Sequence, residues 1–171
     1  MEFEKLARLI LDGLPLRMGN HRGLTAVTRE RSSFENWLKV ELCQVLLEAG
    51  HDPEPDKHKV DVACGDWGIN VRTVSTNIPH EQARSVKLSI TKNVELLIKD
   101  IWRITNPGRS VGFPKRGIVF VVYPLTHDNE RWQSIYLGQI SNELSRLEHR
   151  SFQFASGLPG VLYFGLCSAL G

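Results

Sequence analysis

Three polar side chains lie in two short apolar segments and could act together chemically. Asp61 lies in KVDVAC, and Asn70 and Arg72 lie in GINVRTV, after a turn built on Gly65 and Asp66. Asn70 and Arg72 are two residues apart, so on a strand both side chains project to one face. A hairpin of the two segments would bring Asp61 beside them. A carboxylate, an amide and a guanidinium can together serve a divalent cation or a phosphate group.

Asp61 has two interpretations. Its neighbours Val60 and Val62 are apolar, which is typical of a buried strand. An unpaired charge in such a strand is strongly unfavourable, so Asp61 would need a partner. The alternation K-V-D-V-A equally fits an edge strand on which Asp61 faces water.

A second carboxylate comes from the preceding helix. The segment SSFENWLKVELCQVLLEAG predicts a helix with one of its two leading serines as N-cap, Glu35 in a capping box and a glycine as the stop. Glu41 follows Trp37 by four residues and Leu38 by three, so it shares a face with apolar neighbours. Glu41 therefore has two interpretations. Either its carboxylate faces the polar cluster, or its aliphatic stem packs on the apolar neighbours while the carboxylate stays in water.

The remaining pattern predicts an α/β domain with a mixed central sheet of about four strands flanked by helices. Residues 2–12 form an amphipathic pattern that GLPLRMGNHRG ends, and residues 80–105 are mostly helical in pattern. GIVFVVYPL is typical of a strand buried on both faces. Residues 128–147 predict a helix capped at Asp128, and GVLYFGLCSAL predicts a last strand. Late alternation of strands and helices favours this architecture.

Composition favours one globular domain spanning residues 1–171. The chain is 42% hydrophobic, and its net charge of +2 permits a nucleic-acid partner without requiring one. Its three cysteines are far apart and lack C-x-x-C spacing, which argues against zinc and a disulfide framework. No secretory leader is visible, and no apolar run approaches the ~20 residues of a membrane span. We therefore expect a cytoplasmic protein without a membrane partner.

The polar cluster resembles the catalytic motif of the PD-(D/E)XK nuclease superfamily, which has the restriction-endonuclease-like fold. In that family an acidic residue and a D/E-x-K triplet on the following strand hold magnesium and activate water for phosphodiester cleavage. The resemblance assigns Asp61 to the first acid and Asn70-x-Arg72 to the triplet. It assigns Glu41 to the glutamate of the first core helix.

The resemblance also implies a core of helix, three strands, helix and strand within residues 31–171. Residues 34–49 would be the first helix, and the hairpin with GIVFVVYPL would follow. The helix from Trp132 and the strand GVLYFGLC would complete the core. Residues 1–30 would form a helical extension, and the helix within residues 80–105 an insertion.

Two departures from the family motif bear on activity. Asn70 stands where the family has Asp or Glu, which removes a negative charge from a magnesium site. Arg72 stands where the family has Lys, and arginine stays protonated and cannot act as a base. An active site would use magnesium or manganese with Asp61 and Glu41 as ligands. A relic would hold no metal, and its two carboxylates would pair with Arg72 instead.

Three functions follow from this interpretation. The first is a nucleic-acid-associated protein whose phosphodiesterase activity is weakened or lost. The second is an active metal-dependent DNA endonuclease that uses the four residues of the motif, and the third is a protein-interaction or regulatory subunit without nucleic-acid chemistry. DNA is the expected partner, with RNA, a homodimer or another protein as alternatives. The basic residues assigned to phosphate contact, or otherwise to a solvated surface, are Lys57, Lys59, Arg109, Lys115 and Arg116.

Overall fold

The computed structural model describes residues 1–84, 88–106 and 112–167. The helices are α1 (Phe3–Asn20), α2 (Leu24–Arg29), α3 (Glu35–Glu48), α4 (Ile90–Thr105) and α5 (Leu137–Ser141), with the π-helical turn η1 (Trp132–Tyr136) leading into α5. The strands are β1 (Glu54–Pro55), β2 (Val62–Cys64), β3 (Trp67–Ser75), β4 (Lys115–Tyr123), β5 (Leu144–Gln153) and β6 (Pro159–Cys167).

The described strands form one mixed sheet in the order β1-β2-β3-β4-β6-β5. β3 and β4 run parallel, and every other neighbouring pair runs antiparallel. The α/β class with a mixed sheet flanked by helices is therefore confirmed. The sheet has six strands instead of about four, because β1 lies before the predicted hairpin, where no strand was expected, and β5 begins where a helix was predicted.

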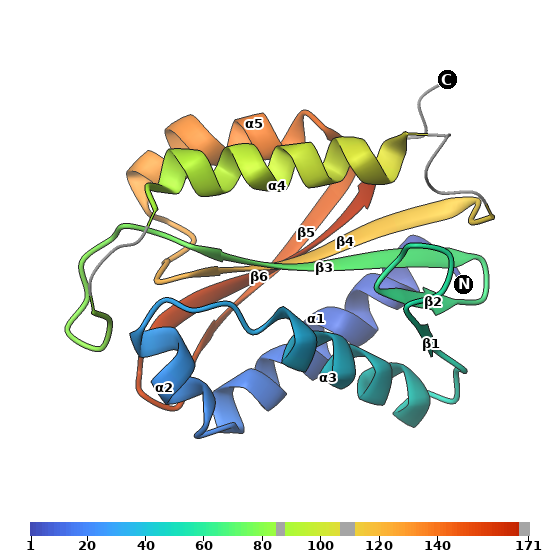
Figure 1. The fold of residues 1–171 in the computed structure, drawn as a ribbon, viewed down its shortest axis with the longest axis horizontal. Coiled ribbons are helices and arrows are strands. Elements are labelled where there is room, and N and C mark those ends of the chain that lie inside the picture. The colour runs from blue at the N-terminus through green and yellow to red at the C-terminus, as the bar shows by residue number, and fades with distance from the viewer. Residues whose placement is uncertain (85–87, 107–111, 168–171) are drawn as a thin grey trace.

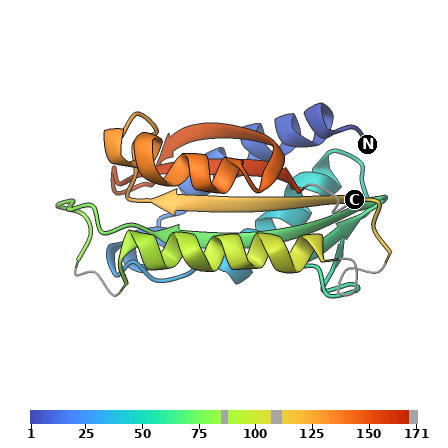
Figure 2. The same cartoon turned by 90° about the horizontal axis from the view of Figure 1, so that it is seen from above.

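Helices cover both faces of the sheet, with α1, α2 and α3 on one side and α4 and the η1–α5 segment on the other (Figures 1 and 2). Side chains along β3 alternate between these faces. Ile69 and Val71 pack in the core under α1 and α3, whereas Val74 packs in the core under α4. Asn70 and Arg72 share the face of Val74 and therefore lie on the α4 side.

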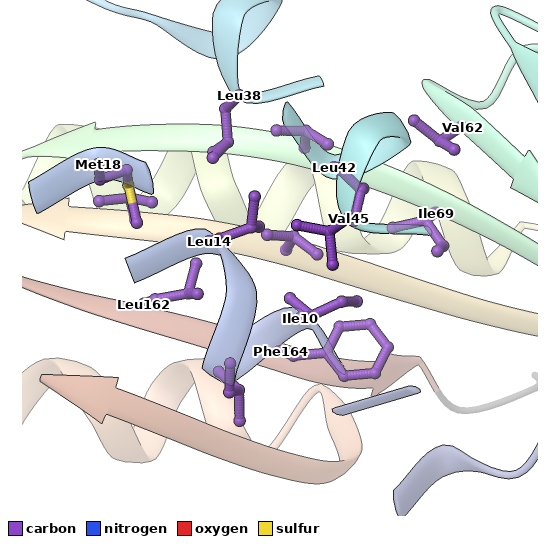
Figure 3. Packing of buried hydrophobic residues seen from close by; sticks show 14 of the residues in the cluster. Ile10, Leu14, Met18, Leu38, Leu42, Val45, Val62, Ile69, Leu162 and Phe164 are labelled. Carbon is purple, nitrogen blue, oxygen red and sulfur yellow. The ribbon is translucent and has the colours of Figure 1, made fainter. Parts of the chain in front are cut away.

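The N-terminal helix is part of the main core. Figure 3 shows the side chains that meet between α1, α3 and the sheet, among them Ile10, Leu14, Met18, Leu38, Leu42, Ile69, Leu162 and Phe164. Residues 1–30 thus pack together with later parts of the described chain around this core. None of the described helices, α1 included, is long and apolar enough to cross a membrane.

The expected break after residue 12 is wrong, because α1 continues to Asn20 with Pro15 inside it. A proline inside a helix costs about 3 kcal/mol. Complete burial of a leucine or methionine side chain stabilises the folded state by about 1.5–3 kcal/mol. Leu14 and Met18, on either side of Pro15, are both fully buried. Gly13 is a contact residue, since a Cβ there would lie 2.8 Å from a Val45 methyl on α3.

The helix predicted over residues 128–147 is shorter, and its capping residue is one position later than expected. The Asn129 side chain, and not Asp128, accepts a hydrogen bond from the Trp132 backbone N–H at 3.0 Å. The helix ends at Ser141, and residues from Leu144 onward form β5. Leu144 continues the helical spacing of apolar residues, but it belongs to β5. Its side chain is buried, and pairing of β5 with β6 satisfies its backbone groups.

A chain of polar contacts on the α4 side ends at two stacked histidines. Trp132 Nε1 donates to Tyr163 Oη at 2.8 Å, and His127 Nδ1 lies 2.9 Å from the same oxygen. The Tyr163 hydroxyl thus links the Trp132 ring to His127. His149 of β5 stacks on His127 with ring centroids 3.5 Å apart. Burial and the neighbouring His127 both lower the pKa of His149.

We expect His149 to make the protein less stable in mild acid. Its pKa is lower in the folded than in the unfolded chain, so the unfolded chain binds the proton more tightly. This contribution is fully present above the ordinary histidine pKa of about 6.5 and is lost as the pH falls below it. Melting temperatures between about pH 5 and pH 8 should fall less in His149→Gln than in the wild type. Identical pH profiles would contradict this.

Candidate functional site

The polar cluster lies where β3 extends beyond its short neighbour. β2 pairs with β3 over three residue pairs, whereas β4 pairs with β3 along its whole length. Beyond β2, the backbone N–H groups of Val71 and Thr73 point to a side that no described strand covers. Asp61 Oδ2 accepts from Val71 N at 2.8 Å, and Glu35 Oε1 accepts from Thr73 N at 3.0 Å. Two carboxylates thus replace the missing strand and close this edge.

Arg72 links Asp61 to α4 through a network of ion pairs. Arg72 Nε donates to Asp100 Oδ2 at 2.6 Å, and Nη1 donates to Asp61 Oδ2 at 3.2 Å and to the Val71 carbonyl at 2.6 Å. Arg103 donates to the other Asp100 oxygen at 3.1 Å. The side chains of Arg72, Asp61 and Asp100 are 26%, 28% and 17% exposed, so water screens the pairs only partly.

The electrostatics of Arg72 follow from these partners. Burial alone would lower the pKa of Arg72, but the hydrogen bond to Asp100 and the charges of Asp100, Asp61 and Glu35 outweigh it and raise the pKa. Arg72 therefore remains a permanent cation between two carboxylates, and it cannot exchange a proton with water near neutral pH.

Asn70 lies beside this network with an unsatisfied oxygen. Its side chain is on the same face as Arg72, the residue is 7% exposed, and Oδ1 has no hydrogen-bond partner among the described residues. Asn70 and Arg72 line a cavity of about 190 Å³ together with Lys59 and Arg103. A buried acceptor without a donor costs about 1–3 kcal/mol, so a bound group that donates to Asn70 would recover this energy.

A second cavity, of about 430 Å³, adjoins the first. Arg72, Asp100 and Arg103 line both, so the ion-pair network forms a wall common to the two. Glu35 and Lys99 line the larger cavity. The result is a polar depression along the exposed edge of β3, with cations from both β3 and α4.

Glu41 does not join this cluster. Its carboxylate pairs with Arg17 of α1 at 2.9 Å, and α3 lies on the face of the sheet opposite to Arg72. The helix glutamate that reaches β3 is Glu35. The expected capping box is absent, because the side chain of Glu35 is bound to β3 and the N-cap residue is Phe34. Ser33 Oγ accepts a long hydrogen bond, 3.4 Å, from Glu35 N. The second carboxylate of Arg72 is Asp100 instead of Glu41.

The structure thus brings Asp61, Asn70 and Arg72 close together, and it adds Glu35 and Asp100, which were not expected at the site. Glu35 had a plausible local role at the helix start, which concealed its long-range one. Asp100 carried only a weak signal, namely its position on the polar side of α4 three residues before Arg103.

Of the five basic residues assigned to phosphate contact, Lys59 lies at the cavity. Lys57 pairs with Glu54 at 2.6 Å. Lys115 lies 3.1 Å from Glu2 and 3.0 Å from Asp66. The two remaining residues are Arg116, which donates to the carbonyls of Ile104 and Thr105 at the end of α4, and Arg109, which lies outside the described residues.

The loop before β2 holds Lys59 in an unusual backbone conformation. Asp56, His58 and Lys59 have φ angles of 57°, 49° and 64°. A non-glycine residue in this left-handed region costs roughly 1–2 kcal/mol, and such conformations persist where surrounding structure enforces them. The loop conformation thus places Lys59 at the mouth of the site.

The residues present do not fit a divalent cation. Magnesium prefers an octahedral shell of oxygens, several of them anionic. Asp61 Oδ2 is already bound by Val71 N and Arg72, whose charge opposes a second cation. Asn70 supplies only a neutral oxygen. Within the described parts of the chain, no group of three or more His, Cys, Asp or Glu side chains is arranged to hold a metal ion.

Comparison with known proteins does not assign the chain to a family. No model of a known protein family, no curated protein and no solved structure matches it. The site is therefore interpreted from its own residues.

We predict that Arg72→Ala lowers the free energy of unfolding by about 2 kcal/mol, because it leaves Asp61 and Asp100 with an unmatched negative charge in a partly buried site. Arg103→Ala is the matched control. Arg103 pairs with the same Asp100, but its side chain is 65% exposed, so its loss should cost less than about 0.5 kcal/mol. Urea unfolding of the three proteins measures both effects, and equal losses would contradict the role given to Arg72.

Proposed function

We propose that this chain is a nucleic-acid-associated protein with a restriction-endonuclease-like core, in which an ion-pair network has replaced the metal site. The observation that carries the proposal is the position of Arg72. It stands where the nuclease motif has its lysine, and its guanidinium lies between Asp61 and Asp100. A cation held in this way stabilises the carboxylates without any metal.

The order of elements supports this core. α3, β1, β2, β3, α4 and β4 follow one another as helix, three strands, helix and strand, the order that the resemblance implies. The assignment differs from the expected one in two ways. β1 supplies the first core strand, and α4 is the second core helix instead of an insertion. Asp61 directly precedes β2, and Asn70-x-Arg72 lies on β3, as the motif requires.

The same residues argue for binding without cleavage. Cleavage in this family needs a metal to polarise the phosphodiester and a group to position or deprotonate water. Arg72 cannot accept a proton, and Asn70 adds no negative charge for a metal. A guanidinium can still bind phosphate oxygens, so the chemistry that remains is recognition of an anion.

Further cations extend the anion-binding surface beyond Arg72. Lys59 and Arg103 line the smaller cavity, and Lys99 and Arg103 line the larger one. A phosphate backbone passing along the edge of β3 would meet these side chains in turn. With a net charge of only +2, binding should be weak and strongly dependent on salt.

We predict that the protein retards duplex or branched DNA at micromolar concentration in low salt, without cleaving it when magnesium or manganese is added. Lys59→Ala should weaken binding about threefold or more and reduce the slope of log affinity against log salt by ~0.9, the effect of one lost phosphate contact.

Lys57→Ala is the matched control, because Lys57 lies two residues away and already pairs with Glu54. It should change neither the affinity nor the slope. Binding that is absent for DNA and RNA alike would overturn the proposal and favour a protein-interaction subunit. Cleavage that requires Asp61 would favour an active endonuclease.

A further inference from the structure

The two edges of the sheet differ in whether their outward backbone groups have hydrogen-bond partners. At one edge, β1 is two residues long and contains Pro55, and the carboxylates of Asp61 and Glu35 bind the N–H groups that β3 leaves open. At the other edge, β5 is a strand of ten residues that pairs only with β6 among the described strands. An open strand of this length is a template for pairing with another chain.

The hydrogen-bonding pattern of the β5–β6 hairpin shows which backbone groups face outward. Phe154 N donates to Leu158 O at 2.9 Å across the hairpin. Because the direction of backbone groups alternates along an antiparallel strand, even-numbered residues of β5 face β6. Leu147, His149 and Ser151 therefore direct their N–H and C=O groups outward, where no described residue binds them.

Charges of alternating sign lie along the same strand. Arg146, Glu148 and Arg150 occupy the face that α1 covers, since Arg146 pairs with Glu4 and Arg150 with Asp12. The side chains of Arg146, Glu148 and Arg150 are 43%, 42% and 55% exposed. These ion pairs are exposed and contribute little, so they leave the three charges available to a partner.

We propose that two copies of this chain form a dimer by antiparallel pairing of their β5 strands, centred on His149. In this register the outward groups of His149 meet those of the partner's His149, and Leu147 meets the partner's Ser151. Glu148 then lies opposite the partner's Arg150, and the two-fold symmetry forms this pair twice. The two Glu148–Arg150 pairs occupy non-hydrogen-bonded positions, where opposite side chains approach most closely.

The charges favour this register over the two that are shifted by two residues. The outward backbone groups of the two β5 strands also face each other when the partner strand is shifted by two residues. In one direction Arg150 then lies opposite the partner's Arg150, and in the other Glu148 lies opposite the partner's Glu148. Like charges directly opposite each other are destabilising. A shift by one residue would set outward groups against inward ones and lose the ladder.

A second copy fits this edge better than an unrelated strand. Charged residues on an edge strand normally prevent pairing. Here Glu148 and Arg150 match each other across a two-fold axis at His149, whereas a strand without this order of charges would meet them unpaired. The dimer would gain about six backbone hydrogen bonds from the three outward residues of each copy. Such a small interface should dissociate in the micromolar range.

The test is a charge exchange measured by sedimentation equilibrium of the full chain between roughly 1 and 100 µM. The wild type should dimerise reversibly. Glu148→Arg should weaken the dimer about tenfold, because it sets arginine against arginine twice. Glu148→Arg combined with Arg150→Glu should recover most of the affinity, because the reciprocal pairs return with exchanged signs.

Two controls keep the outcome specific to this edge. Glu54→Arg reverses an exposed charge on β1, at the opposite edge of the sheet, and should leave the dimer unchanged. Ser151→Pro removes an outward N–H and should make the protein monomeric, with its circular dichroism spectrum retained. A wild type that is monomeric throughout the range, or a dimer that is indifferent to Glu148→Arg, would overturn the proposal. The DNA binding proposed for Lys59 does not depend on whether the protein forms this dimer.

Discussion

The guanidinium of Arg72, held between Asp61 and Asp100, is the interaction on which the candidate site depends. It joins the start of β2, the middle of β3 and the helix α4, three elements that are distant in sequence. The network is partly shielded from water, so each partner needs the others to compensate its charge. The same charge that holds the elements together also opposes a metal ion at this position.

The carboxylates have a second structural role that explains their presence on a sheet edge. Asp61 and Glu35 bind backbone N–H groups of β3 that would otherwise lack a partner. Removing either would expose an unsatisfied donor in a partly buried site, which is costly even without any catalytic role. Acidic residues can therefore persist at such a site for the sake of the fold, after or without metal chemistry. The Asn70 oxygen has no comparable role, because no described residue donates a hydrogen bond to it.

The sequence predicted local features where one short-range signal dominated. The buried strand β4 and the hairpin of β2 and β3 followed from apolar runs and a glycine turn, and the proximity of Asp61, Asn70 and Arg72 followed from the hairpin. Errors arose where tertiary contacts outweighed local preference. Pro15 was read as a break, but packing of α1 carries the helix through it. The residues of β5 were read as the end of a helix, because a helical and an extended pattern both bury Leu144. The partners Glu35 and Asp100 could not be predicted from spacing, since the contacts that define them span 38 and 28 residues.

The most direct test of this account is the effect of manganese on thermal stability. Manganese accepts imperfect ligand sets, so it is the stricter probe for a remaining metal site. If Arg72 has replaced the metal, the melting temperature of the wild type should not change with added manganese. The double variant Asn70→Asp with Arg72→Lys removes the guanidinium and adds a carboxylate beside Asp61, so its melting temperature should rise with manganese. A clear rise in the wild type would show that the site still binds metal and would contradict the account.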